Sequence, residues 1–272
     1  MDRTLSSLHK KLLFFLIPVL VCIVYLGSTG LSSATRQDKS SVTVNNLTRS
    51  CDLLNVEKHK DHIKLSVQNN SNMAITAFVL TSKYNPRMVF TFREEFAFSE
   101  GDNVIPPGQN YDITIGIPDG LSRQTEITLN LSSVIYEDGS SEGDPQTIRD
   151  TVDSRLGRKI QIMKILPVLD RISHLPDAEL GFYWNKTAKQ DMETALNAPD
   201  SDSLLKLNKK LLNQDEPNNK FNHFKSGAQA GKETIFQKYE ELKDVQEKQG
   251  IGALRDAIIG FKYLYTKIVN KF

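Results

Sequence analysis

Cysteine is nearly absent from this chain of 272 residues, which holds only Cys22 and Cys51. Cys22 falls in an apolar run near the N-terminus, so removal of that run would leave Cys51 alone, with no internal disulfide. A small secreted module stabilised by several disulfides is therefore excluded. Val21 stands where a lipidation signal needs a small residue, which argues against a lipoprotein.

The motifs of common enzyme classes are also missing. The sequence contains no G-x-S-x-G nucleophile elbow, no G-x-x-x-x-G-K-[ST] phosphate loop and no H-E-x-x-H zinc motif. Gly250-Ile-Gly252 is only a fragment of a dinucleotide fingerprint, and it follows a predicted helix instead of a strand. We therefore expect no catalytic or cofactor-binding residue and no cofactor, and the sequence favours a protein that is not an enzyme.

An excess of positive charge is lacking as well. The first 34 residues hold three basic residues and one acidic residue, so the remaining 238 carry 31 basic against 32 acidic residues, a net charge of −1. Binding to nucleic acid requires a clear basic excess, because phosphates must be neutralised. Nucleic acid is therefore excluded as the main partner.

What the sequence does have, at its start, is a basic flank followed by an apolar run. Lys10 and Lys11 precede fifteen almost entirely apolar residues, Leu12 to Leu26, and a small, polar stretch comes next. This order is typical of an export signal. Residues 1–34 are predicted to be a signal peptide or an N-terminal membrane anchor.

Two fates of this segment stay open. Ser32 and Ala34 supply small residues where signal peptidase acts, so cleavage near Ala34 would release a secreted protein. Alternatively, residues 12–31 supply the roughly 20 residues that span a bilayer and would anchor the protein. In both cases the basic flank stays in the cytosol, so the rest of the chain is expected to be extracytoplasmic, in the periplasm or at the cell surface.

Residues 41–143 alternate between apolar and polar side chains in short runs. Ile63, Leu65 and Val67 show this period of two, and turn-forming residues interrupt the pattern every eight to twelve positions. Such a pattern is typical of an antiparallel β-sandwich. We expect six or seven strands, followed by a helical region, so the fold class is α+β.

The helical region is predicted to cover residues 144–272. Asp144-Pro145 reads as an N-cap followed by proline in the first turn, and Pro167 is expected to kink or end the first helix. Residues 186–213 suggest two short helices, the second beginning at Asp202.

The C-terminal segment, residues 228–272, is predicted to form an antiparallel helical hairpin. Apolar residues spaced by 4, 3, 4, 3 and 4 form a heptad seam: Leu254, Ile258, Phe261, Tyr265, Ile268 and Phe272. A more polar stripe lies upstream, and Gln249-Gly-Ile-Gly252 between the two is a natural turn.

Two polar clusters contain residue types that can ligate a metal ion. Glu137, Asp138, Glu142 and Asp144 group hard oxygen ligands in one loop, but the loop lacks the spacing of an EF-hand, and a turn followed by a helix cap explains these residues without a cation. His59-Lys-Asp-His62 lacks nearby further ligands for zinc and falls where a turn between strands is expected. We favour the structural interpretation of both, with a cation loop as the alternative for the first.

Aromatic residues mark a possible contact surface. Gly181-Phe-Tyr-Trp184 lies in a predicted connector, and the seam adds aromatic rings. Such residues either plug a core or bind another chain. The six candidates are Phe182, Tyr183, Trp184, Phe261, Tyr265 and Phe272. Core packing is favoured for both groups.

The stretch from Ile63 to Tyr136 resembles the immunoglobulin-like sandwich modules of bacterial envelope proteins. The motifs that carry the resemblance are VQNNSNMAITAFVL, VIPPGQNYDITIGI and the closing VIYEDGS, and they cover about a third of the chain. The last motif, followed by a helix, also resembles uncharacterised exported bacterial proteins. The resemblance implies a module that binds or spaces other molecules, and it supplies no catalytic residue.

Three functions follow as hypotheses. The first is a non-catalytic exported or membrane-anchored envelope protein whose sandwich and helices serve protein–protein contact or self-association. The second is a carrier of a small ligand held where the helices meet the sandwich. The third is a hydrolase without a sequence motif, for which Asp112, Glu126 and Glu137 are the carboxylates to inspect.

Overall fold

The computed structural model describes residues 41–271, except for 86–87, 99–103 and 200–219. The predicted signal or anchor segment, the predicted helix from Asp202 and the seam residue Phe272 all lie outside the described residues. Within the described part, no helix combines the length and the apolar character that a membrane crossing needs.

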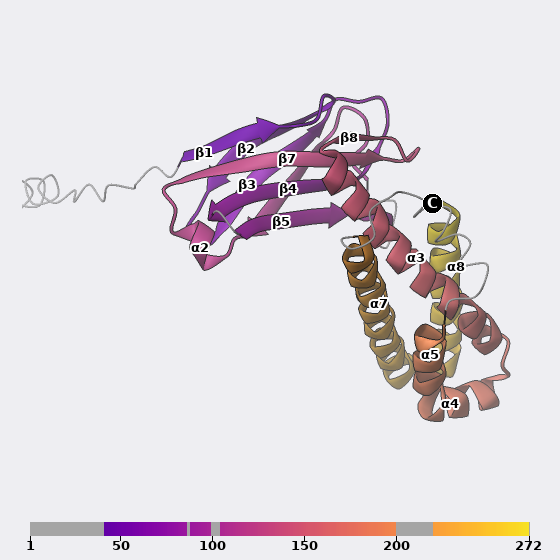
Figure 1. The fold of residues 1–272 in the computed structure, drawn as a ribbon. Helices are drawn as coiled ribbons and strands as arrows, with labels where there is room; N and C mark the ends of the chain where they lie inside the picture. Colours follow the sequence, from indigo (N-terminus) through magenta and orange to yellow (C-terminus); the bar gives the residue numbers. More distant parts are fainter. Residues whose placement is uncertain (1–40, 86–87, 99–103, 200–219, 272) are drawn as a thin grey trace, which may run out of the picture. The chain divides into compact units, whose positions relative to one another are not determined.

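An α+β fold is confirmed, with the strands before residue 144 and the long helices after it (Figure 1). The strands are β1 Ser41–Asn46, β2 Cys51–Lys58, β3 His62–Asn69, β4 Ile75–Asn85, β5 Met88–Glu95, β6 Asn110–Gly116, β7 Glu126–Tyr136 and β8 Ser141–Gly143. Two short helical turns, η1 Phe96–Phe98 and α2 Asp119–Ser122, connect some of them. The helices that follow are α3 Pro145–Ser173, α4 Asp177–Lys186, α5 Ala188–Asn197, α7 Lys220–Gln249 and α8 Ile251–Lys271.

The strands form two sheets that share one core. One sheet has the order β1-β7-β4-β5, with β8 also paired to β7, and the other has the order β2-β3-β6. Alternate residues of both sheets point into the core, as the period of two predicts. Its fully buried members include Ile63, Val67, Phe78, Leu80, Leu129 and Leu131.

One sheet is mixed, so the prediction of a purely antiparallel arrangement is wrong. β1 pairs with β7 in parallel, from Ser41↔Glu126 to Asn46↔Leu131. Parallel neighbours need a crossover, and here the chain crosses to the other sheet through β2 before β7 forms much later. Period-two alternation gives the face of each residue but carries no information on strand direction.

Helix α3 begins where the sequence predicts. The Asp144 carboxylate accepts the Thr147 N–H at 2.8 Å, and Pro145 occupies the first turn. The helix does not end at Pro167, however, but continues to Ser173. Ile165 and Leu169 on either side of the proline are fully buried in the helical core, and this burial offsets the roughly 3 kcal/mol that an interior proline costs.

The aromatic stretch at 181–184 is not a connector, because it lies inside α4. Leu180 and Trp184 are four residues apart and both are buried, so they face the helical core from one side of α4. Gly181 is tolerated because its helix is stabilised by this burial rather than by helix propensity.

The helical hairpin forms at the predicted turn. Gly250 alone separates α7 from α8, with φ of +87°, a conformation that favours glycine. The first arm starts at Lys220, eight residues before the predicted start of the hairpin. The buried residues of α8 are Leu254, Ile258, Phe261, Tyr265 and Ile268, the predicted seam, and they join one core with residues of α3, α4, α5 and α7.

Helices α3 and α7 cross with their backbones in contact. A Cβ added to Gly157 would meet backbone atoms of Phe224, Gly227 and Ala228, and a Cβ on Gly227 would overlap the Ser154 backbone. Gly231 lies one turn further along the same contact, where an added Cβ would be 3.1 Å from the Arg158 Cα. Only glycine permits so close a crossing.

A buried ion pair connects α3 to the sheets. The Arg155 guanidinium donates three hydrogen bonds of 2.7 to 3.0 Å to the Glu95 carboxylate and one of 3.0 Å to the Thr76 hydroxyl. The two charged side chains are 9% and 8% exposed. This pair fixes the helix against β4 and β5.

Candidate protein-contact site on the helical hairpin

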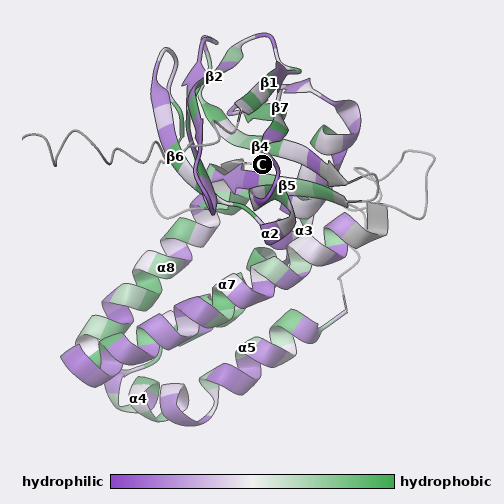
Figure 2. Ribbon diagram, turned by 90° about the vertical axis from the view of Figure 1, so that its left-hand side faces the viewer, coloured by the Kyte–Doolittle hydropathy of each residue, from purple (hydrophilic) through white to green (hydrophobic). Residues whose placement is uncertain are grey.

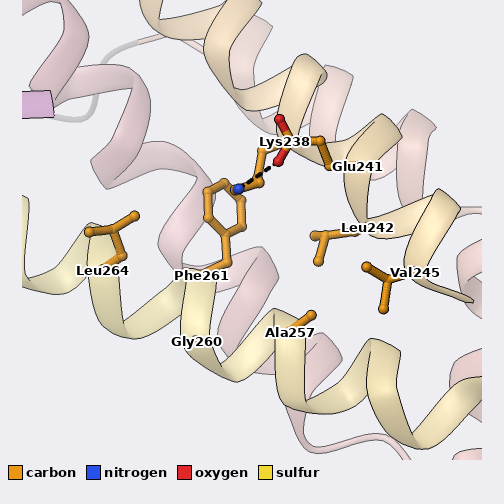
Figure 3. Close-up of a pocket in the computed structure, with 8 residues that line it drawn as sticks. All are labelled: Lys238, Glu241, Leu242, Val245, Ala257, Gly260, Phe261 and Leu264. Atoms are coloured by element: carbon orange, nitrogen blue, oxygen red, sulfur yellow. Dashed lines mark hydrogen bonds and ion pairs between the residues drawn. The ribbon is translucent and has the colours of Figure 1, made fainter. Parts of the chain in front are cut away.

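An open groove runs between the two arms of the hairpin. Its walls come from α7 and α8, and its volume is about 270 Å³. The lining residues are Lys238, Glu241, Leu242, Val245, Ala257, Gly260, Phe261 and Leu264 (Figure 3). Most of these side chains are apolar, so the groove is suited to an apolar segment rather than to a charged ligand.

The order of the lining residues follows from the antiparallel arms. Val245 near the end of α7 and Ala257 near the start of α8 line the end of the groove close to the turn at Gly250, whereas Lys238 and Leu264 lie further from that turn (Figure 3). Ala257, Gly260 and Leu264 recur at intervals of three and four on α8, so they share one helical face.

A charged pair lies at the α7 side of the groove. The Lys238 ammonium is 2.6 Å from the Glu241 carboxylate and 5.9 Å from the centroid of the Phe261 ring (Figure 3). Phe261 itself is only 5% exposed. Its ring is therefore part of the helical core that ends at the groove, with the lysine above it as a cation–π partner.

Glycine 260 keeps the groove open. A Cβ added at this position would meet no atom within 4 Å, in contrast to the glycines at the α3–α7 crossing. A helix from another molecule can approach closely where the surface residues are small. Gly260 and Ala257 therefore leave room at the part of α8 where a close contact needs it.

Exposed apolar side chains also occur on α8 outside the lining of the groove. Ile259 is 48% exposed and Tyr263 is 71% exposed. Tyr263 also borders a second hollow of about 380 Å³ with Thr266, Lys267 and Asn270. Figure 2 shows hydrophobic segments recurring along α8. Helix α8 thus has apolar side chains on more of its circumference than the part that packs against the rest of the chain.

The aromatic residues of α4 are divided between core and surface. Trp184 is 1% exposed and its ring stacks on Tyr239 at a centroid distance of 5.0 Å. Phe182 is 70% exposed. The Tyr183 hydroxyl donates to the Asp191 carboxylate and accepts from Arg171, and burial together with the Asp191 bond raises the Tyr183 pKa to about 12. Tyr183 therefore serves as a neutral hydrogen-bond donor that ties α4 to α5 and α3.

The aromatic residues of the seam lie inside the chain. Phe261 and Tyr265 have ring centroids 4.1 Å apart, and both side chains are buried. With Trp184 they stabilise the helical core. Of the predicted contact residues that the structure describes, Phe182 alone exposes most of its side chain.

The acidic residues 137–144 do not converge on a common point. Asp138 accepts the Ser140 N–H and hydroxyl, and Asp144 caps α3. Glu137 lies 3.4 Å from the Ala74 N–H. Each carboxylate thus has its own donor, as the turn-and-cap interpretation expects. Across the described residues, no three histidine, cysteine or acidic side chains group as metal ligands.

Glu142 holds the loop between β1 and β2 in place through hydrogen bonds. Its carboxylate accepts hydrogen bonds from the Arg49 N–H at 2.6 Å, the Ser50 N–H at 2.9 Å and the Ser50 hydroxyl at 2.8 Å. Desolvation acts to raise the pKa of Glu142, but these donors outweigh it and lower the pKa below its ordinary value. The role of Glu142 is therefore to hold the crossover that follows the parallel strand β1.

The histidine pair forms the turn that the sequence predicts. His59 follows the end of β2 and His62 begins β3, and the His59 N–H donates to the His62 carbonyl at 2.8 Å. Their rings stack at a centroid distance of 4.5 Å, and the His62 Nδ1 is 2.7 Å from Asp61. The two residues stabilise the turn.

The carboxylates suggested for a hydrolase are dispersed. Glu126 begins β7 and Glu137 follows its end, so an extended strand separates them by roughly 35 Å. Asp112 lies on the other sheet, in β6, where its carboxylate accepts the Ser66 hydroxyl. These three residues cannot act on one substrate bond.

The groove residues Ala257, Gly260 and Leu264 were not singled out in the sequence. Their spacing resembles that of the neighbouring seam, so on a helical wheel they form a second stripe beside it. The combination of a small residue with two apolar ones outside the seam is the signal that would have identified them.

Comparisons with protein families, with curated proteins and with solved structures give no match to this chain.

Proposed function

We propose that this chain is a non-catalytic protein of the bacterial cell envelope, exported or anchored by its N-terminal segment, whose helical hairpin binds another protein. The observation that carries the proposal is the open apolar groove between α7 and α8, with Gly260 at its surface. Protein–protein interfaces commonly have an apolar centre that loses its water on binding and a polar rim around it. Lys238 and Glu241 supply a polar rim on the α7 side.

Export is supported by the sequence. Lys10 and Lys11 before the apolar run have the order of an export signal. Cys51 is also compatible with an oxidising compartment, since it is fully buried, and burial raises its pKa to about 12. A thiol of this kind is unreactive, so it would not form disulfides between copies of the protein.

The β region has a strand order that supports an immunoglobulin-like fold. β2, β3 and β6 correspond to strands A, B and E of such a fold, and β8, β7, β4 and β5 correspond to G, F, C and C′. The short β8 covers only Ser133 to Ile135 of β7, and β1 pairs in parallel with the preceding part of that strand. A crystal structure of residues 35–272 would test this correspondence.

The contact role is tested by filling the groove. Gly260→Leu places a side chain where an added Cβ meets no atom, so the helix should form normally while the groove closes. Gly252→Leu is the matched control, because Gly252 lies on the same helix, is exposed and also has open space around it. Neither position is in the helical core.

The measurement is photo-crosslinking in intact cells from a probe residue at Tyr263, with detection of the crosslinked product by mass spectrometry. We expect one product that the wild type and Gly252→Leu share and that Gly260→Leu loses at least about tenfold. A product that is a dimer of this chain identifies a second copy as the partner. Equal crosslinking in all three proteins, or none in any, would overturn the proposal and return attention to a small-ligand carrier.

A further inference from the structure

We propose that the junction of β5 and α3 binds an anionic group with two or more oxygen acceptors, a phosphate or a carboxylate, between the guanidinium groups of Arg93 and Arg158. Neither the predicted contact surface nor the hairpin groove includes these residues. The site goes beyond the proposed contact function and does not depend on it.

The two arginines are brought together by the elements that the Arg155–Glu95 pair connects. Arg93 lies two residues before Glu95 on β5, so both side chains point to the same face of the sheet. Arg158 lies three residues after Arg155 on α3, on the same side of the helix. The ion pair therefore brings both arginines to one junction, where the charge of Arg158 acts on Arg93.

Both guanidinium groups have a buried donor without an acceptor. Among the described residues, the Nε–H of Arg93 and the Nε–H of Arg158 are shielded from solvent, and neither meets a hydrogen-bond acceptor. An unsatisfied buried donor costs about 1–3 kcal/mol, more on a charged group, so native proteins rarely keep one. Two of them at a single junction indicate that an acceptor from outside the chain belongs there.

The surrounding carboxylates do not supply this acceptor. Glu95 is engaged by Arg155 through three hydrogen bonds. Asp150 accepts the side-chain amide of Gln146 at 2.7 Å and lies 3.4 Å from His223. Glu95 and Asp150, the two carboxylates that act on Arg93, thus already accept hydrogen bonds from Arg155 and Gln146.

The pKa of Arg93 reflects the same surroundings. Burial lowers its pKa from the ordinary value, and the cations Arg158 and Arg155 act in the same direction, against Glu95 and Asp150. An anion bound beside Arg93 would reverse this effect. Both arginines are half-buried, so part of each residue remains in contact with solvent.

Chemistry limits the ligand to an oxyanion. Guanidinium groups pair with phosphates and carboxylates through parallel N–H···O bonds, and two of them can share one such group. The apolar Phe98 ring, whose centroid is 5.4 Å from the Arg158 guanidinium carbon, covers one side of that group and favours a compact anion.

The test uses isothermal titration calorimetry on the full chain with inorganic phosphate and with acetate as probes, at an ionic strength held constant with sodium chloride. We expect saturable binding of at least one probe, weakened at least about tenfold in both Arg93→Gln and Arg158→Gln. Arg149→Gln is the matched control on α3, since Arg149 is exposed and bonds only to Gln146 among the described residues. A preference for phosphate or for acetate distinguishes the two classes of ligand.

Two outcomes would overturn the site: a response no larger than that to chloride, or binding that both glutamine variants retain. Thermal unfolding of each variant provides a second measurement without ligand. Because Arg93 and Arg158 leave buried donors unsatisfied, their replacement by glutamine should lower the midpoint by no more than a few degrees. The variants should therefore remain folded for the titration.

Discussion

Along α3, from Ser154 to Arg158, the neighbouring helix comes so close that glycine is required on both sides, and the charged side chain of Arg155 is buried. Along α8, from Ala257 to Leu264, a glycine faces open space and apolar side chains border a groove. The same residue type thus closes one helix contact and leaves another open. The two kinds of glycine differ in what surrounds them. A Cβ added to a structural glycine would meet atoms of the same chain, whereas a Cβ added to Gly260 would meet open space that a partner can fill.

The stretch of α3 from Ser154 to Arg158, the closed stretch, should be more sensitive to substitution than the open stretch of α8 from Ala257 to Leu264. Within it, Arg155→Met should have the largest effect on stability. It leaves the Glu95 carboxylate buried, 8% exposed, without its partner. Removing one member of a buried pair costs about 3–5 kcal/mol, which corresponds to a fall of about 10 °C in the thermal midpoint. Circular dichroism on heating measures this effect.

Arg149→Met is the control for this experiment, because it removes an exposed arginine from the same helix. Its midpoint should stay within about 2 °C of the wild type. A double variant, Arg155→Met with Glu95→Gln, should recover part of the loss, since the uncompensated charge is removed. Equal losses in the single and the double variant would show that the ion pair is not the cause.

The glycine comparison itself is tested by two identical substitutions. Gly227→Ala would drive a methyl group into the Ser154 backbone, so we expect destabilisation by about 2–3 kcal/mol. Gly260→Ala meets no atom and should stabilise the protein by about 0.5–1 kcal/mol, because alanine has the higher helix propensity. Urea denaturation gives both values. Similar changes in the two variants would remove the distinction between closed and open helix contacts.

The fold around the closed contact between α3 and α7 was only partly predictable from the sequence. Periodicity gave the α+β division, the N-cap at Asp144 and the turn at Gly250, because each depends on residues close together in the sequence. Gly227 and Gly231 form a small-residue repeat within α7, but nothing local shows that Gly157 faces them. The parallel pairing of β1 with β7 has the same cause, since it joins residues about 85 positions apart.

The candidate site was predictable to a smaller extent. The seam of α8 was identified as a whole, and the structure buries its described members. The residues beside the seam stay exposed only where α7 and α3 do not cover α8. The spacing of residues along α8 does not show where these two helices lie. Arg93 and Arg158 lie 65 positions apart and are brought to one junction by the buried Arg155–Glu95 pair.

The smallest expected effect on stability comes from the N-terminal caps of the two helices, α3 and α8. α8 follows Gly250, which has no side chain for capping, whereas α3 begins at the Asp144 cap, on which the alignment of the closed stretch depends. Asp144→Ala should cost about 1 kcal/mol at neutral pH. The Thr147 N–H and hydroxyl lower the pKa of Asp144 below its ordinary value of 3.8.

The pH dependence of this cap follows from that direction. Because the folded-state pKa is lowered, the contribution of Asp144 is fully present above the unfolded value and is lost as the pH falls through the folded value. Asp144→Asn keeps a capping acceptor that does not titrate, so its thermal midpoint should match the wild type at pH 7 and fall less than the wild type between about pH 4 and pH 2. If both proteins lose stability in parallel over this range, then the carboxylate is not the acceptor that fixes α3, and the closed stretch is positioned by the glycine crossing and the Arg155–Glu95 pair alone.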